Sequence, residues 1–76
     1  MTVRAYVLIE AQIGKTKEVV EAIRKVQGVA SVDVVTGSYD AIAIVEAETL
    51  VDIGDLIVAR VYTVAGISRT VTCLVV

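Results

Sequence analysis

Six apolar segments divide this chain, and the order of their periodicities limits the folds available to it. Val3–Ala11 is rich in β-branched and aliphatic residues, which is typical of a strand. Lys15–Val26 instead repeats its apolar side chains at helical spacing and carries charges on its other side. Two strand-like segments follow, Val29–Thr36 and Tyr39–Ala47, and the few residues between them predict an antiparallel hairpin with a tight turn.

A second helix and a last strand complete the series. Thr49 resembles the first residue of a capping box, with Asp52 three positions later. The helix that follows is predicted to turn these apolar side chains inward: Leu50, Ile53, Leu56, Ile57, Val61 and Val64. Gly66 ends it, and Ile67–Val76 forms the last strand. The order β-α-β-β-α-β predicts one α+β domain over residues 1–76, ferredoxin-like, with a four-stranded antiparallel sheet and two helices on one face.

The predicted sheet carries apolar residues on the face that the helices leave open. These residues are Tyr6, Leu8, Ile42, Ile44, Leu74 and Val76. Bare to water they would form a larger apolar patch than monomers tolerate, so we expect two sheets to pack face to face as a dimeric α/β sandwich. Self-association also explains why 57% of so short a chain is hydrophobic. A membrane segment does not explain it, because charges interrupt every run that approaches the roughly 18 apolar residues a span needs.

The residue types argue against several functions. There is no histidine and no C-x-x-C pair, so we expect no metal and no cofactor. Cys73 lies in an apolar strand and is expected in the core, not as a nucleophile. Phe and Trp are absent, which removes the stacking platform of RNA-binding relatives of this fold. The net charge is −2 and the basic residues alternate with acidic ones, so nucleic-acid binding is not expected. Catalysis is not expected either, although a carboxylate-based activity stays open.

The predicted hairpin carries the candidate ligand-binding residues. Gly37, Ser38, Tyr39 and Asp40 bring together an exposed glycine amide, a hydroxyl, an aromatic ring and a carboxylate. Turn N–H groups can hold a ligand carboxylate, and an acidic side chain can accept from an ammonium group, which suits a zwitterion. A plain turn explains the same glycine and aspartate. Two hydroxyls of the last strand, Thr70 and Thr72, are further candidates, although threonine is also ordinary strand filler.

Three stretches of the chain resemble the effector domain, or RAM domain, of the Lrp/AsnC transcription regulators. They are Gly28-Val29, the V-T-G-S-Y-D run at 35–40, and V-A-G-I-S-R-T-V-T at 64–72. The resemblance implies dimers that form through their sheets and assemble into rings such as octamers or decamers. It also implies that an amino acid binds between dimers, near Gly37, Tyr39 and Asp40, with Thr70 and Thr72 as contacts.

The 76 residues depart from the family in lacking its N-terminal helix-turn-helix. We therefore expect a stand-alone, cytoplasmic module that senses amino acids or modulates full-length Lrp/AsnC regulators, without binding nucleic acid or membrane itself. Two alternatives share the fold class: a small dimeric α/β-barrel enzyme, and an ACT-like amino-acid-binding domain. A purely structural assembly partner with an empty site is a third.

Overall fold

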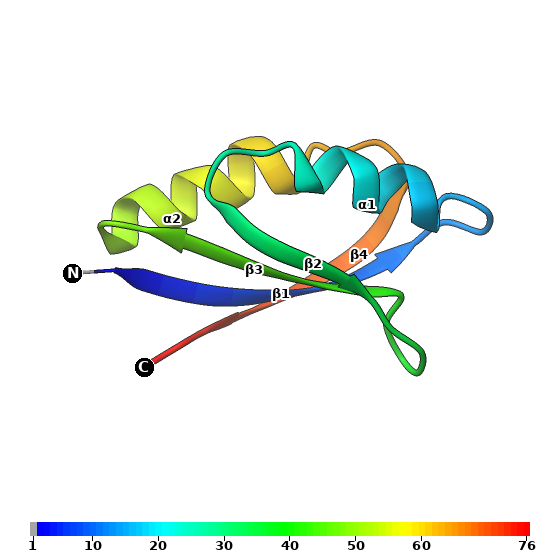
Figure 1. Cartoon of the computed structure of the whole chain (residues 1–76), viewed down its shortest axis with the longest axis horizontal. Coiled ribbons are helices and arrows are strands. Elements are labelled where there is room, and N and C mark those ends of the chain that lie inside the picture. The colour runs from blue at the N-terminus through cyan, green and yellow to red at the C-terminus, as the bar shows by residue number, and fades with distance from the viewer. Residues whose placement is uncertain (1) are drawn as a thin grey trace.

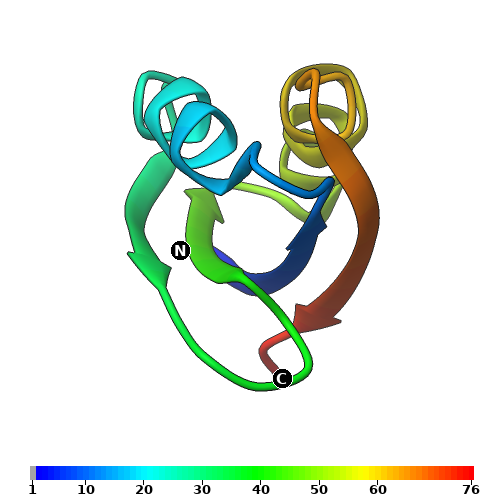
Figure 2. The same cartoon turned by 90° about the vertical axis from the view of Figure 1, so that its right-hand side faces the viewer.

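The computed structural model describes residues 2–76, and its elements follow the predicted order. They are β1 (Val3–Ala11), α1 (Thr16–Arg24), β2 (Val29–Val34), β3 (Ala41–Ala47), α2 (Leu50–Leu56), the π-helical turn η1 (Ile57–Val61) and β4 (Ile67–Leu74). The strands pair antiparallel in the order β2-β3-β1-β4. Both helices lie on one face of this sheet, as Figures 1 and 2 show. The ferredoxin-like prediction is confirmed.

The core lies between the helices and the sheet. Alternate residues of the strands supply one half of it: Ala5, Val7, Ile9, Val32, Ala41, Ala43 and Val45. The helices supply the other half: Val19, Val20, Ile23, Ile53, Ile57 and Val61. No polar or charged residue within residues 2–76 is buried, so apolar burial supplies the main stabilisation of this fold. None of the helices described is long and apolar enough to cross a membrane.

The connection from α1 to β2 depends on Gly28, which has a φ of +99°. A Cβ atom at this position would lie 2.7 Å from Cδ2 of Leu56, which comes from α2. The carbonyl oxygen of Gly28 also accepts a hydrogen bond from the N–H of Glu46 at 2.8 Å. Glycine is therefore required here both by the backbone conformation and by the close approach of α2.

The second helix begins as predicted, but its first apolar residue points outward. The hydroxyl of Thr49 accepts from the N–H of Asp52 at 3.1 Å, which confirms the N-cap. Leu50 was expected in the core and is 61% exposed, so that prediction is wrong. The buried face is centred on Ile53 and Ile57, and a residue three positions before Ile53 lies about 60° away around the helix.

The helix changes its winding in η1. Here the N–H of Tyr62 donates to the carbonyl oxygen of Ile57 at 2.9 Å, a bond that spans five residues instead of four. Just beyond η1, the hydroxyl of Tyr62 lies 2.8 Å from Oγ1 of Thr72 in β4. This bond ties the end of the second helix to the edge of the sheet.

The register of β4 corrects our assignment of its two faces. Leu74 pairs with Ala5, which is buried beneath the helices, so Leu74 lies on the helix side and not on the open one. Val71 and Cys73 pair with Leu8 and Tyr6 and take the open positions. Cys73 is accordingly exposed and not a core residue. Val76 lies beyond the end of the strand.

We use the term open face for the side of the sheet away from the helices. Its apolar centre consists of Tyr6, Leu8, Ile42, Ile44, Val71 and Cys73. An ion pair lies toward each end: Nη2 of Arg4 is 2.7 Å from Glu46, and Nη2 of Arg69 is 3.7 Å from Glu10. The hydrogen bond and the charge of Glu46 raise the pKa of the Arg4 guanidinium, so Arg4 stays charged at any physiological pH. An apolar centre bounded by charges is the arrangement found in protein interfaces.

Candidate ligand-binding site

The loop between β2 and β3 is longer than predicted. A tight turn at Gly37-Ser38 was expected, whereas β2 ends at Val34 and β3 begins at Ala41, which leaves residues 35–40 as the connection. The N–H of Val35 donates to the carbonyl oxygen of Asp40 at 2.9 Å and closes the base of the loop. Figure 2 shows the loop projecting beyond the sheet on the side of the open face.

Asp40 holds this loop against β1. Its N–H donates to the carbonyl oxygen of Ile9 at 2.8 Å. Its Oδ2 accepts from the N–H of Ala11, also at 2.8 Å. Ala11 lies beyond Ile9, the last β1 residue that pairs with β3, so the Asp40 carboxylate supplies an acceptor for an N–H that no β3 residue pairs with. On the other side of β1 the pairing with β4 shifts register at the same point, where Ser68 of β4 is the extra residue. The position expected to bind a ligand ammonium group therefore has a structural role as well.

The tip of the loop offers backbone donors. Gly37 and Ser38 are exposed, and Gly37 has a φ of +120°, which favours glycine. Within residues 2–76, no backbone N–H from position 36 to position 39 donates to another residue. No side chain lies within 4 Å of where a Cβ of Gly37 would be, so a ligand could approach this backbone closely. Several unused N–H groups on one short loop can hold an anionic group.

Tyr39 connects the loop to a pair of charges on the open face. The guanidinium carbon of Arg69 lies 5.7 Å from the centre of the Tyr39 ring, within the range of a cation–π contact. The same guanidinium lies 3.7 Å from the Glu10 carboxylate, too far for a hydrogen bond. Both side chains of this pair are substantially exposed. A cation with free donors and a carboxylate with free acceptors thus lie together beside the loop.

Thr70 and Thr72 lie on a different side of the sheet. They pair with Ile9 and Val7, whose side chains are buried beneath the helices, so both hydroxyl groups project from the helix side. The hydroxyl of Thr72 already bonds Tyr62. The structure thus brings Gly37, Ser38, Tyr39 and Asp40 together in one loop but does not place the two threonines beside them.

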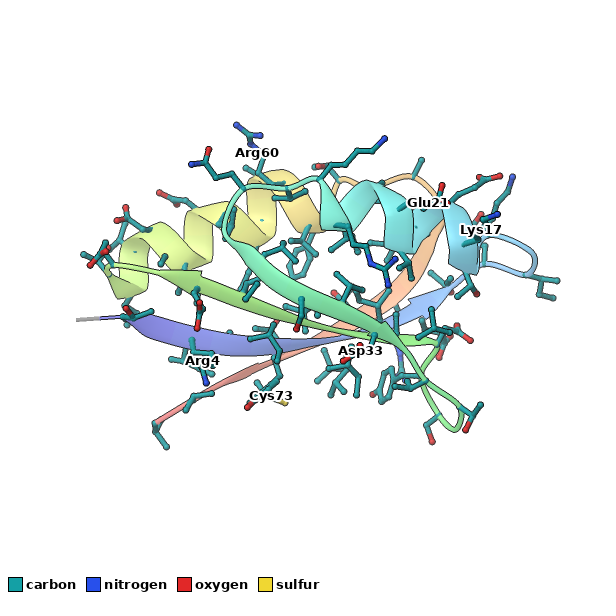
Figure 3. The ribbon with its side chains drawn as sticks, in the orientation of Figure 1. Arg4, Lys17, Glu21, Asp33, Arg60 and Cys73 are labelled. Atoms are coloured by element: carbon teal, nitrogen blue, oxygen red, sulfur yellow. The ribbon has the colours of Figure 1, made fainter. Side chains whose placement is uncertain are left out.

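The residues missed at the sequence level are Glu10 and Arg69. Each looks like an isolated surface charge until β1 and β4 are paired, when they become direct cross-strand partners. Their pairing depends on the bulge after Glu10, which no local pattern marks. Figure 3 shows the labelled Arg4, Asp33 and Cys73 beneath the sheet, on the side where this charged pair also lies. No cluster of three or more metal-ligating side chains occurs in the described part of the chain.

Comparisons with known proteins agree on one family. The family model of the Lrp/AsnC ligand binding domain matches residues 4–76. An HTH-type transcriptional regulator of Pyrococcus furiosus is 35% identical over 71 residues, which are 90% of this chain and 47% of the regulator. The chain thus spans about half the length of that curated relative.

Two solved structures match over nearly their whole length. The crystal structure of FFRP-DM1 is similar with a TM-score of 0.92 and 32% identity, and the match covers 97% of this chain and 99% of that one. A protein of Thermus thermophilus is similar with a TM-score of 0.91 and 31% identity, over 97% of this chain and 92% of that one.

Proposed function

The chain belongs to the Lrp/AsnC ligand-binding domain family, and we propose that it works as an oligomeric amino-acid-binding regulatory module. In this proposal it acts by binding and not by catalysis, and it does not read DNA itself. Amino-acid binding would either serve as a sensor signal or modulate full-length Lrp/AsnC regulators in the cytoplasm. The observation that supports the proposal is the contact between Tyr39, which belongs to a loop with unused N–H groups, and Arg69 of the Glu10–Arg69 pair.

The groups on the loop and on the charged pair suit the two charges that all amino acids share. The Arg69 guanidinium offers a planar fork of donors, which matches a carboxylate and can bind it through two hydrogen bonds. The N–H groups of Gly37 and Ser38 can add to the same anion. The Glu10 carboxylate can accept from the ammonium group, and the Tyr39 ring gives the ligand an apolar surface to lie on.

Asp40, Thr70 and Thr72 were also predicted to bind the ligand, and we propose a different role for the aspartate than for the two threonines. Asp40 holds the loop in place and keeps one carboxylate oxygen, Oδ1, for a ligand. Thr70 and Thr72 contact a ligand only if it extends around the β4 edge to the helix side. The proposed site therefore centres on the loop and on the adjacent charged pair.

Self-association completes the module. The apolar centre of the open face is rimmed by two ion pairs, and a second copy of the chain is the partner we propose for it. The resulting dimer is an α/β sandwich with helices on both outer sides. We propose further that such dimers assemble into a ring, such as an octamer or decamer, and that the amino acid binds between dimers where the loops meet a neighbour.

A thermal-shift screen against the twenty amino acids tests the proposal. A ligand present at about 100 times its dissociation constant stabilises the folded state by about 2.7 kcal/mol, which raises the melting temperature of a domain this size by roughly 10–20 °C. Arg69→Gln should then weaken the ligand found in the screen by about 10–100-fold, because one partner of a charge-assisted pair is lost.

Lys17→Gln is the matched control for this screen, because it also removes one positive charge, on the outer side of α1 (Figure 3). It should leave the thermal shift unchanged. If no amino acid at millimolar concentration shifts the melting temperature, the proposed function is wrong. If a shift occurs and Arg69→Gln does not reduce it, the module binds amino acids but at another site.

A further inference from the structure

The last strand, β4, has a free backbone edge. No strand within residues 2–76 lies beyond it in the order β2-β3-β1-β4, and Figure 2 shows no element beside it. The N–H of Val75 donates to the carbonyl oxygen of Arg4 at 2.9 Å, and residues that bond β1 alternate with residues that do not. Thr70, Thr72 and Leu74 therefore turn their N–H and C=O groups away from β1. The edge is a row of backbone donors and acceptors that repeats about every 7 Å.

The side chains at this edge do not protect it. Proteins usually shield a free edge strand with a charged residue, a proline or a covering helix. Thr70, Thr72 and Leu74 are neither charged nor proline. The second helix packs over β3 and β1 instead of β4. Leu74 and Thr72 are consequently exposed although their side chains lie on the helix side, where Val7 and Ala43 of the neighbouring strands are buried.

An apolar stripe of the second helix borders the same edge. Val51, Val58 and Tyr62 follow one another at intervals of seven and four residues, which places them along one side of the helix. They are between 43% and 72% exposed, whereas a solvated helix face normally carries polar residues. The hydroxyl of Tyr62 lies 2.8 Å from Oγ1 of Thr72, so this side of the helix adjoins β4. We call the free edge of β4 and this stripe together the β4 margin.

The two parts of the β4 margin indicate what kind of molecule covers it. A lipid chain or a small apolar molecule would cover the stripe but leave the edge N–H and C=O groups without partners. An extended peptide satisfies both parts, because its backbone bonds the edge while its alternate side chains lie against Val58 and Tyr62. An antiparallel strand fits the rest of the sheet, in which every pair is antiparallel.

A charge beside the stripe specifies the peptide further. Asp55 lies four positions after Val51 and three before Val58, so it is on the same side of the helix. It forms no ion pair with another residue among positions 2–76. A lysine or arginine among the apolar side chains of the peptide would therefore complement this surface.

We propose that the β4 margin binds an extended segment of a partner protein as a fifth strand, antiparallel to β4, with alternate apolar side chains and one basic residue opposite Asp55. One added strand is a small interface, so a short peptide should bind with a dissociation constant of roughly 10 µM to 1 mM. The edge-facing groups and the stripe take no part in the candidate amino-acid site. The inference therefore does not depend on the proposed function.

A capped, fluorescein-labelled heptapeptide is the probe, in which four threonines alternate with valine, lysine and valine. In an antiparallel fifth strand, the valine and lysine N–H groups face β4 while their side chains face the helix. A second peptide with these three nitrogens methylated keeps the side chains but loses the edge bonds, and should bind at least about tenfold more weakly. Anisotropy measures both affinities. Amide hydrogen exchange by NMR should show Thr70, Thr72 and Leu74 slowed at least about tenfold by the first peptide alone.

Protein variants test the stripe and the charge separately. Val58→Ser should weaken the lysine peptide by about 3–10-fold, whereas Val34→Ser, at an exposed valine on the other edge strand, should not. The unchanged protein should prefer the lysine peptide over its glutamate analogue by about 2–5-fold, and Asp55→Lys should reverse this preference. Glu21→Lys makes the same change of charge on the outer side of α1 (Figure 3) and should leave the preference as it is. Circular dichroism checks that each variant keeps the fold.

Four results would each overturn the proposal. The first is that the lysine peptide at millimolar concentration does not slow exchange at the three edge amides. The second is that the methylated peptide binds equally well. The third is that Val58→Ser binds as tightly as Val34→Ser, or that Asp55→Lys keeps the original preference. The fourth is that the three amides are already protected in the protein alone, because a second copy of the chain would then occupy the edge.

Discussion

The carboxylate of Asp40 accepts a hydrogen bond from the backbone N–H of Ala11 across 29 positions of the chain. The bond joins the residue just before β3 to the last residue of β1, next to the point where the pairing of β1 with β4 shifts register. Asp40 thereby fixes the loop of residues 35–40 relative to the charged pair formed by Glu10 and Arg69. The geometry of the candidate site depends on this one backbone contact as much as on the residues that would touch a ligand.

Replacing Asp40 should destabilise the fold as well as the site. Asp40→Ala leaves the N–H of Ala11 without its acceptor, and the loss of a hydrogen bond to a charged group costs about 1.5–3 kcal/mol. Asp40→Asn keeps an acceptor oxygen and should cost less. Urea unfolding measures both. Asp33→Ala, an exposed acid on β2, is the control and should change stability by no more than about 0.5 kcal/mol. Equal stability of Asp40→Ala and the control would show that the bond to Ala11 contributes nothing.

Gly37 and Gly28 both have a positive φ, but only Gly28 is crowded, so alanine variants of the two measure backbone strain and crowding separately. Gly37→Ala introduces only the strain, because its surroundings are open, and should cost about 1–3 kcal/mol. Gly28→Ala adds a contact of 2.7 Å with Leu56, so it should cost about 1–3 kcal/mol more. In a Leu56→Ala background this additional cost should disappear, as a double-mutant cycle measured by urea unfolding can establish. If the cycle shows no coupling energy between positions 28 and 56, the cost of Gly28→Ala does not come from contact with Leu56.

The fold was predictable from the sequence because its main signals are local. Alternation in β1 and β3, helical spacing in α1 and the Thr49 cap each lie within one segment, and the order of the segments then determined the topology. The motifs at 35–40 and 64–72 also identified the family correctly.

The errors arose where the answer depends on pairing between distant strands. Both registers of β4 are partly apolar, so the sequence did not distinguish Leu74 from Val71 as the open-face residue. The bulge after Glu10 sets that register, and it also makes Glu10 and Arg69 neighbours. The charged half of the candidate site therefore became visible only in three dimensions, whereas the loop residues were found from their types.

Thr72 either acts only by bonding Tyr62 or also contacts the ligand, and variants of the two residues distinguish these roles. Tyr62→Phe and Thr72→Val each remove the same bond, so each should cost about 0.5–1 kcal/mol and the double variant should cost little more than either alone. If Thr72 acts only through Tyr62, neither variant should change amino-acid binding in the thermal-shift screen. A loss of binding with Thr72→Val alone would instead place this hydroxyl in contact with the ligand.

Charge in the centre of the open face should separate the copies that pack there. Val71 is exposed in the single chain and pairs with Leu8, so Val71→Lys should leave the fold intact but place two ammonium groups in an apolar interface. Losing the burial of two valines at about 1.5 kcal/mol each weakens the dimer by about 100-fold. Val34→Lys makes the same change at an exposed valine on the helix side of β2 and should leave the dimer unaffected. Light scattering at matched concentrations measures both, and a Val71→Lys protein that stays dimeric would mean that the copies associate through another surface.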